Sequence, residues 1–166
     1  MKTAFLITAR LKSTRLPKKI LLEVAGKPLI VHMLDRIKRA LTIDKIIICT
    51  STNPQDDPLE EIAGQEQVSC FRGSEEDVLV RLLEAAQSHG LKYFANITAD
   101  CPMMDPLLID RAVLEYQKAD VDLLKYDDSN ADLPFNCYLI KVSAPEKICL
   151  QKKETDTEDW VKHFTL

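Results

Sequence analysis

Residues 3–19 read TAFLITARLKSTRLPKK, a short apolar run followed directly by a polar and basic stretch. The continuous apolar run from Thr3 to Thr8 is typical of a strand that is buried on both faces. The stretch from Ala9 to Lys19 holds five Lys and Arg residues, a Ser-Thr pair and a proline. A loop that only turned the chain would not need these residues, whereas a loop that held a polyanion would. We therefore expect a first strand that ends in an anion-binding loop.

The rest of the chain alternates between predicted strands and predicted helices. Strands are predicted at residues 45–50, 68–71, 93–98, 122–126 and 136–142, and helices at 28–41, 75–90, 106–119 and from Ser143 onward. Residues 51–58, STNPQDDP, are predicted to form a turn-rich loop. This βαβ spacing indicates an α/β fold with a mostly parallel sheet covered by helices on both faces. Without an internal repeat or an obvious linker, we expect one domain over residues 1–166.

Composition excludes several classes of protein. Of the 166 residues, 46% are hydrophobic and 29% charged, which is typical of a folded globular chain. The net charge of −4 argues against a general nucleic-acid surface. The five cysteines show no metal-ligand spacing and are interpreted as reduced thiols. With no secretory signal and no apolar run near the roughly 20 residues of a membrane span, we expect a cytoplasmic protein without a membrane partner.

Three polar clusters follow predicted strands: ARLKSTRLPKK (9–19), FRGSEED (71–77) and TADCPMMD (98–105). In open α/β sheets, ligands bind beyond the carboxyl ends of the strands. We therefore expect the three clusters to lie at one edge of the sheet, although they are far apart in the sequence.

The first cluster has the composition of a phosphate site. Arg10, Arg15 and Lys19 could grip a triphosphate, and the Ser13 and Thr14 hydroxyls and backbone N–H groups could fill the gaps. The stretch is neither a Walker loop nor a GxGxxG motif. The alternative is a solvated basic loop, which residue spacing alone does not exclude.

The other two clusters offer a candidate metal ligand and a candidate cation. Asp100 follows the predicted strand 93–98, and a carboxylate there could hold Mg²⁺ against phosphate oxygens. The alternative role is a turn or helix cap, but Asp105 already fills the cap position before Pro106. Ser74 can cap the helix predicted at 75–90, which leaves Arg72 without a structural explanation. No catalytic role is assigned to a histidine.

Three segments of the sequence resemble a known family. TARLKSTRLPKKILLEVAGKPLI, FRGSEEDVLVRLLEAA and ITADCPMMDPLLID are similar, in this order, to blocks of the cytidylyltransferases that activate acidic sugars. These relatives include the 3-deoxy-manno-octulosonate and acylneuraminate cytidylyltransferases. The branch with the strongest similarity is that of the spore-coat polysaccharide biosynthesis protein F. The resemblance covers the chain from Lys2 to about Leu114.

The resemblance implies a Rossmann-like α/β/α sandwich, and a reaction of CTP with an acidic sugar that releases pyrophosphate in polysaccharide or glycan biosynthesis. It further implies Mg²⁺ as the cofactor and a homodimer. Carried over residue by residue, the resemblance implies that the nucleotide is bound by Thr8, Ala9, Arg10, Ser13, Arg15 and Lys19. It places Arg72, Gly73 and Ser74 near the nucleotide. The catalytic residues that it implies are Arg15, Lys19 and Asp100, and Asp100 would also bind the metal ion. Such a reaction needs positioning, cations on the departing pyrophosphate and a metal clamp.

The sequence departs from the family pattern at three places. Lys18 stands where the family usually has Gly, and Asn136 and Tyr138 stand where it has acidic residues that help to shape the sugar site. The chain is also shorter than its relatives, which carry a second metal-binding Asp near their C-terminus. Asp156 in TDTEDWV is the candidate for that ligand, although the segment aligns equally well with an earlier part of the family.

These departures leave other functions open. The chain is either a truncated domain or a diverged relative. The alternatives to an active cytidylyltransferase are a non-catalytic nucleotide- or sugar-binding homologue and a nucleotidyltransferase that uses another base.

Overall fold

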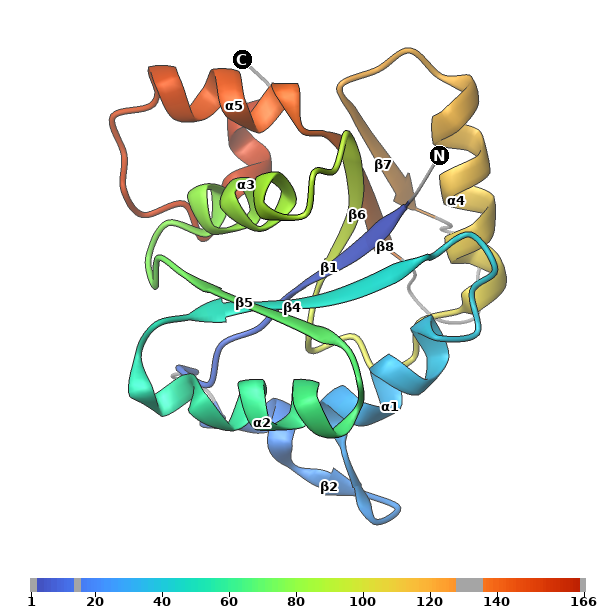
Figure 1. Ribbon diagram of the computed structural model, residues 1–166, viewed down its shortest axis with the longest axis vertical. Helices are drawn as coiled ribbons and strands as arrows, with labels where there is room; N and C mark the ends of the chain where they lie inside the picture. Colours follow the sequence, from blue (N-terminus) through green and yellow to red (C-terminus); the bar gives the residue numbers. More distant parts are fainter. Residues whose placement is uncertain (1–2, 14–15, 128–135, 165–166) are drawn as a thin grey trace.

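A computed structural model describes residues 3–13, 16–127 and 136–164 (Figure 1). The strands are β1 Ala4–Thr8, β2 Glu23–Val24, β3 Lys27–Pro28, β4 Lys45–Ser51, β5 Ser69–Gly73, β6 Tyr93–Thr98, β7 Leu123–Asp127 and β8 Asn136–Lys141. The α-helices are α1 Leu29–Ile37, α2 Asp57–Gln65, α3 Val78–Ser88, α4 Pro106–Lys118 and α5 Ser143–Gln151. Three 3₁₀ turns, η1 to η3, cover Lys19–Leu21, Pro54–Asp56 and Trp160–Phe164.

The main sheet has six strands in the order β5-β4-β1-β6-β8-β7. The pairs β5–β4, β4–β1 and β1–β6 are parallel, and β8 is antiparallel to both of its neighbours. The expected mostly parallel sheet is therefore confirmed. β1 lies between β4 and β6, with Leu6 opposite Ile47 on one side and Asn96 on the other. The carboxyl ends of β1, β4 and β6 consequently meet at one edge.

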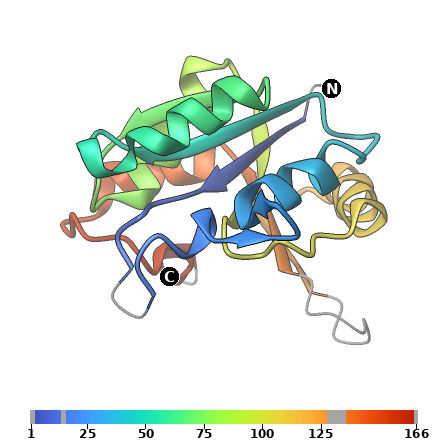
Figure 2. The ribbon, with the colours of Figure 1, turned by 90° about the horizontal axis from the view of Figure 1, so that it is seen from below.

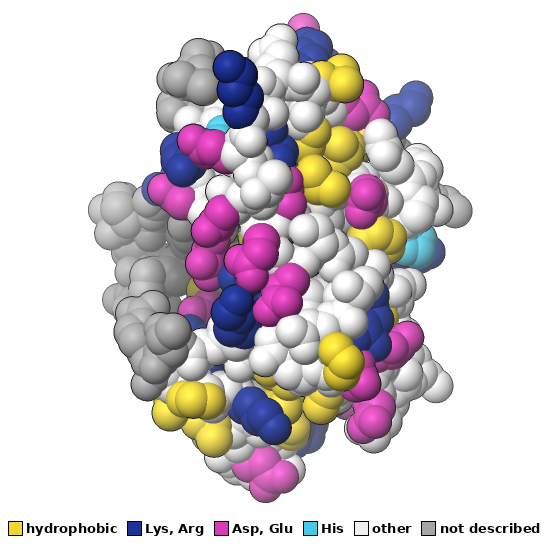
Figure 3. Space-filling model, turned by 90° about the vertical axis from the view of Figure 1, so that its left-hand side faces the viewer, with side chains coloured by type: hydrophobic (Ala, Val, Ile, Leu, Met, Phe, Trp, Pro, Cys, Tyr) yellow, Lys and Arg dark blue, Asp and Glu magenta, His cyan; other side chains and the backbone are white. Residues whose placement is uncertain are grey.

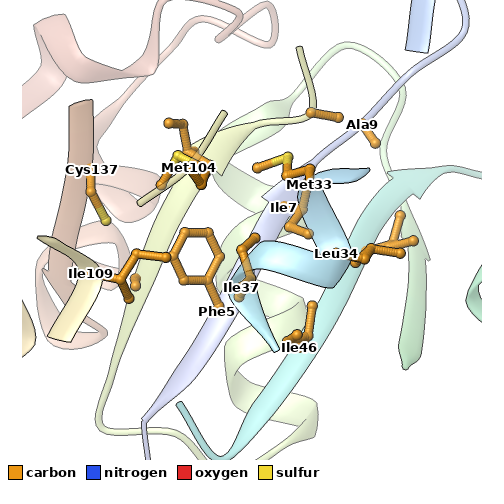
Figure 4. Packing of buried hydrophobic residues seen from close by; sticks show 14 of the residues in the cluster. Phe5, Ile7, Ala9, Met33, Leu34, Ile37, Ile46, Met104, Ile109 and Cys137 are labelled. Carbon is orange, nitrogen blue, oxygen red and sulfur yellow. The ribbon is translucent and has the colours of Figure 1, made fainter. Parts of the chain in front are cut away.

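Helices cover both faces of the sheet, because β1 is apolar on both sides. Phe5 and Ile7 pack with residues of α1, α2 and α4, and Figure 4 shows Phe5 and Ile37 within this core. Ala4 and Leu6 belong to the other core, with residues of α3 and with Trp160. Figure 1 shows α3 and α5 together on one side of the sheet and α1 and α2 on the other. The chain therefore has the three layers of an α/β/α sandwich.

Local structure departs from the sequence-based expectations at several places. Residues 51–58 contain the turn η2 and the start of α2 as well as a loop, because Asn53 caps η2 and Asp57 and Pro58 occupy the first turn of α2. The helix expected from residue 75 begins at Val78, since Asp77, and not Ser74, accepts the capping hydrogen bond from Val80 N. Helix α1 ends at Ile37 instead of near Leu41, which is 92% exposed.

The remaining helices follow the expectation. Asp105 caps α4 by accepting a hydrogen bond from Leu107 N at 2.9 Å, with Pro106 as the first helical residue. Helix α5 begins at Ser143 as expected, but without a side-chain cap. Within the described part of the chain, no helix has the length and apolarity that crossing a bilayer requires.

Candidate active site

A cleft of 330 Å³ opens where β1 and β6 end. Four segments line it. They contribute Thr8, Ala9, Arg10, Lys12, Ser13, Lys19 and Ile20 from the first strand and loop, Glu76 and Val78 from the start of α3, Thr98, Ala99 and Asp100 from the end of β6, and Glu158 and Trp160 from the C-terminal segment. The parallel pairing of β1 with β6 brings the first and third polar clusters together, as the sequence predicted. The C-terminal wall was not predicted.

Lys19 and Asp100 form an ion pair inside this cleft. Lys19 Nζ lies 2.6 Å from Asp100 Oδ2, and the Thr98 hydroxyl donates to Asp100 Oδ1 at 2.6 Å. Burial by itself raises the pKa of the Asp100 carboxyl, but the hydrogen bonds from Lys19 and Thr98 outweigh it and hold this pKa below its ordinary value. Both side chains remain partly exposed, at 33% and 40%. Asp100 is therefore a carboxylate that a ligand in the cleft can reach.

Arg10 links the first loop to two other segments. Its guanidinium donates to the backbone oxygen of Glu75 at 2.7 Å and to Glu158 Oε1 at 2.8 Å. The Arg10 side chain is only 11% exposed, whereas that of Glu158 is 77% exposed. An incoming anion can therefore displace the exposed carboxylate of Glu158 while Arg10 stays in place.

Lys12 is also paired with acidic residues at the rim of the cleft. Its Nζ lies 3.0 Å from Glu76 Oε1 and 3.6 Å from Glu75 Oε1. The hydrogen bond to Glu76 and the charges of both carboxylates raise the pKa of Lys12. Figure 3, which faces the edge where β4 and β5 end, shows basic and acidic side chains intermingled. Lys12 of the first loop is therefore paired with carboxylates and is not a fully solvated cation.

Two hydrogen bonds shape the described part of the first loop. Ser13 lines the cleft, and its hydroxyl accepts a hydrogen bond from Leu16 N at 3.3 Å. Lys18 N donates to the backbone oxygen of Leu11 at 3.3 Å, which closes the loop. Thr14 and Arg15 lie outside the described residues, so the role expected of Arg15 stays a prediction.

Lys18 has a backbone conformation that explains the glycine of the family pattern. Its φ is 54° and its ψ 25°, in the left-handed region. This conformation costs an L-residue with a Cβ roughly 1–2 kcal/mol, and glycine adopts it freely. The Lys18 side chain is exposed. The substitution of Gly by Lys therefore strains the backbone but does not place a side chain in the core.

In the second cluster, Glu76 lines the cleft, whereas Arg72 to Ser74 are not among its described lining residues and make structural contacts. Arg72 donates to the backbone oxygens of Ser51 and Asn53 at 3.0 and 3.1 Å. It also pairs with Asp57 at 2.6 Å and Glu60 at 2.9 Å. The guanidinium therefore ties β5 to the start of α2, which is the structural explanation that the sequence did not supply.

Gly73 and Ser74 pack around buried Arg81. A Cβ on Gly73 would lie 2.9 Å from a ring carbon of Phe71 and 3.2 Å from Arg81 Cγ. Arg81 Nη1 donates to the backbone oxygens of Ser74 and Glu75. Arg72, Gly73 and Ser74 do not belong to the described lining of the cleft. Their expected place near a nucleotide stays a prediction.

Asp156 lies in a second hollow beside the cleft. This hollow is lined by Glu154, Thr155, Asp156, Glu158, Asp159 and Lys162. Asp156 Oδ1 accepts a hydrogen bond from Glu158 N at 3.2 Å. Glu158 lines both hollows, so the two adjoin at this residue. Within the described ranges, no group of three or more His, Cys, Asp or Glu side chains could hold a metal ion by itself.

Sequence reasoning missed two buried polar residues beside the cleft. Asp56 is fully buried and accepts hydrogen bonds from Leu11 N at 2.8 Å and from the Ser51 hydroxyl, which fixes the first loop to η2. Thr157 is also fully buried and contacts the start of α3. A polar residue that is buried by a distant segment leaves no periodic signal in the sequence.

The five cysteines are free thiols. Burial raises the pKa of the Cys101 thiol beside Asp100, which disfavours a nucleophilic role for Cys101.

The fold is a Rossmann-like α/β/α architecture with a polar cleft beyond the carboxyl ends of its parallel strands. The chain belongs to the cytidylyltransferase family, whose model matches residues 4–158. The 3-deoxy-manno-octulosonate cytidylyltransferase of Brucella suis is 36% identical over 129 residues, which are 74% of this chain and 49% of that protein. The spore coat polysaccharide biosynthesis protein SpsF of Bacillus subtilis is 34% identical over 110 residues, which are 64% of this chain and 46% of that protein.

A solved structure shows the same fold. That of a cytidylyltransferase from Leptospira borgpetersenii matches with a TM-score of 0.87 at 28% sequence identity, and the match covers 99% of this chain and 71% of that chain. The resemblance inferred from the three sequence blocks is therefore confirmed. The chain spans about half the length of the two curated relatives, at 49% and 46%.

Proposed function

We propose that the cleft between the first loop and the end of β6 binds the triphosphate of CTP and transfers the cytidylyl group to an acidic sugar, with release of pyrophosphate. The observation that carries this proposal is the Lys19–Asp100 pair, which joins a cation and a carboxylate at 2.6 Å inside the cleft. Membership of the cytidylyltransferase family and the names of the relatives support the choice of CTP and of a sugar acid.

The cations of the first loop would hold the phosphates. Lys19 would leave Asp100 for a phosphate oxygen, and Arg10 would leave Glu158, because a phosphate offers each a charge-assisted hydrogen bond. Arg15 is proposed to join them, on the strength of the sequence pattern. Thr8, Ala9 and Ser13 line the same cleft and would surround the nucleotide.

Asp100 is the proposed ligand of Mg²⁺. Its carboxylate is a hard oxygen donor that is partly exposed in the cleft, and Mg²⁺ is commonly bound through one or two carboxylates together with substrate phosphates. The residues therefore fit this ion, with Asp156 as a second candidate in the adjoining hollow. When bound, the ion would neutralise charge on the phosphate oxygens.

The reaction would be an in-line displacement at the α-phosphorus. A hydroxyl oxygen of the sugar forms a bond to the α-phosphorus, the bond to the bridging oxygen of the β-phosphate breaks, and the hydroxyl proton passes to solvent. Lys19 and Arg10 would stabilise the negative charge on the departing pyrophosphate. The chain spans about half the length of these two curated relatives. We also propose that it binds a sugar acid, forms a homodimer and is located in the cytoplasm.

A pyrophosphate-release assay tests this function. The chain is incubated with CTP and Mg²⁺ and with each of a panel of sugar acids, among them 3-deoxy-manno-octulosonate and an acylneuraminate, with neutral sugars as controls. The proposal predicts release with at least one sugar acid, and release that is at least tenfold slower with Lys19→Met at limiting CTP. Nucleotide binding without release would favour the non-catalytic homologue, and release with another nucleotide would favour a different base.

A further inference from the structure

We propose that Thr157 and Asp77 are positioning residues for the cleft. They fix residues 154–160, here called the C-terminal strap, against the start of α3, so that Glu158 and Trp160 form one wall of the nucleotide site. The inference rests on the proposed function, because it assigns the strap a role in CTP binding. The strap reaches the first loop through the ion pair of Glu158 with Arg10, and the two segments overlap at the lower left of Figure 2.

The hydroxyl of Thr157 joins the strap to the first turn of α3. It donates to Asp77 Oδ1 at 2.8 Å and accepts from Leu79 N at 2.9 Å. Thr157 N also donates to the backbone oxygen of Glu76 at 3.3 Å. Thr157 is fully buried, so each of these polar groups would be costly to leave unpaired. A single hydroxyl therefore sets where the strap meets the helix.

The second oxygen of Asp77 binds Lys152, whose Nζ also donates to the backbone oxygen of Glu154 in the strap at 2.8 Å. Lys152, just after α5, donates from Nζ to Asp77 Oδ2, and their side chains are 8% and 10% exposed. Asp77 Oδ1 also accepts from Val80 N at 3.1 Å as the cap of α3. A buried pair of this kind contributes little net stability but strongly favours one geometry when every partner is satisfied. The contacts thus specify the position of the strap.

These contacts also use the N–H groups at the start of α3. The free N–H groups of a helix N-terminus often bind phosphate. Here Leu79 N donates to Thr157 and Val80 N to Asp77, while Val78 N donates to the backbone oxygen of Glu76. One of these N–H groups therefore holds the strap and the other two are paired within the start of α3, so we expect the first loop to hold the phosphates.

The strap carries two residues into the cleft. Glu158, next to Thr157, pairs with Arg10 at 2.8 Å. Trp160 lines the cleft and packs edge-on against Tyr138 and Phe164, with ring centroids at 5.1 and 5.6 Å. Release of Thr157 would therefore displace Trp160 and with it part of the cleft wall, without altering the loop that holds the phosphates.

The competing interpretation is a strap that only stabilises the fold. Loss of a purely stabilising contact lowers the fraction of folded enzyme, so the apparent kcat falls while the KM for CTP is unchanged. Loss of a positioning contact changes the shape of the site, so the KM for CTP rises while kcat per folded molecule changes little. The two interpretations therefore differ in which kinetic constant responds.

The test uses Thr157→Val, which removes the hydroxyl and keeps the shape. Thr157→Ser restores the hydroxyl, and Thr155→Val makes the same chemical change at an exposed position of the strap. Trp160 is the single tryptophan of the chain, so its fluorescence reports the cleft directly. We expect Thr157→Val to raise the KM and the fluorescence-derived Kd for CTP with Mg²⁺ at least tenfold, with kcat within threefold of the wild type. Thr157→Ser and Thr155→Val should stay within threefold in all constants.

A second measurement, quenching of Trp160 fluorescence by acrylamide without nucleotide, follows the strap itself. We expect low quenching in the wild type, where Trp160 is 5% exposed, and a clear increase in Thr157→Val. Wild-type CTP affinity in Thr157→Val, or failure of Thr157→Ser to restore it, would overturn the inference. If Thr157→Val does not fold, Lys152→Met is measured in the same way and carries the same expectations. A wild-type chain that binds no CTP contradicts the proposed function, and the quenching result then decides whether Thr157 fixes the strap.

Discussion

Lys19 and Asp100 are 81 residues apart in the chain, and their side chains meet at 2.6 Å across the cleft. The parallel pairing of β1 with β6 is the cause, because the two strands end side by side with Thr8 opposite Thr98. Lys19 is the first residue of the turn η1, which follows the first loop, and Asp100 lies two residues after the end of β6. The pair joins the expected phosphate-binding cation to the expected metal ligand.

Replacement of Lys19 by Met should weaken CTP binding at least tenfold. The substitution removes a charge-assisted contact to phosphate, which is worth roughly 1.5–3 kcal/mol. Titration calorimetry with CTP and Mg²⁺ measures the effect. Lys27→Met is the matched control, since it breaks an exposed ion pair of 2.8 Å with Asp35 that does not belong to the cleft lining. Equal CTP affinity in the wild type and in Lys19→Met would mean that the first loop is a solvated basic loop that does not bind the nucleotide.

Replacement of Asp100 by Asn should abolish the Mg²⁺-dependent part of nucleotide binding. The amide keeps the shape of the side chain but removes its charge, so it holds a divalent cation poorly. Without ligand, stability should change by less than about 1 kcal/mol, because the lost ion pair with Lys19 is partly exposed. Melting curves with and without Mg²⁺ and CTP separate the two effects. A large loss of stability combined with unchanged Mg²⁺ dependence would make Asp100 a turn-capping residue.

Replacement of Lys18 by Gly should stabilise the chain by about 0.5–1 kcal/mol. Relief of the left-handed strain at φ 54° exceeds the entropy that a glycine adds to the unfolded chain. Urea denaturation measures the change. Lys92, an exposed loop residue that is not among the described positive-φ residues, provides the control, and Lys92→Gly should lower stability. Loss of stability in both variants would mean that Lys18 is not strained.

Replacement of Arg72 by Met should lower stability by about 1–3 kcal/mol and leave CTP affinity within threefold of the wild type. The guanidinium serves two backbone oxygens and two carboxylates around the start of α2, and the two oxygens would lose a donor. Denaturation and CTP titration on the same variant measure the two quantities. A tenfold loss of CTP affinity at unchanged stability would instead assign Arg72 to the nucleotide, as the sequence pattern suggests.

The fold and about half of the cleft could be predicted from the sequence, because they depend on patterns formed by residues that are neighbours in the chain. The apolar runs of β1, β4 and β6 are buried on both faces, and the rule that ligands bind beyond parallel strands brought Lys19 and Asp100 to one edge. Asp105 was identified as a cap for the same reason, since a helix start depends on neighbouring residues.

The rest of the site depends on contacts between distant segments. Arg72 resembles a phosphate ligand in the sequence, and its carbonyl and carboxylate partners come into reach only when β4 and β5 pair. Thr157 and Trp160 occupy a polar C-terminal stretch with no periodic pattern, so their burial against α3 and β8 was not predictable. Helix α2 was missed because the pattern of STNPQDDP is that of a turn, whereas Asp57 and Pro58 are the first residues of the helix.

The most direct test of the account is a titration of the wild-type chain with CTP, UTP, ATP and GTP, each with Mg²⁺, followed by Trp160 fluorescence and by melting temperature. A ligand that binds only the folded chain raises the melting temperature, and at a fixed concentration a tighter ligand raises it more. The account predicts that CTP binds at least tenfold more tightly than the other three and changes the Trp160 signal. If no nucleotide at millimolar concentration changes either signal, the assignment of the cleft to a CTP-dependent reaction is wrong.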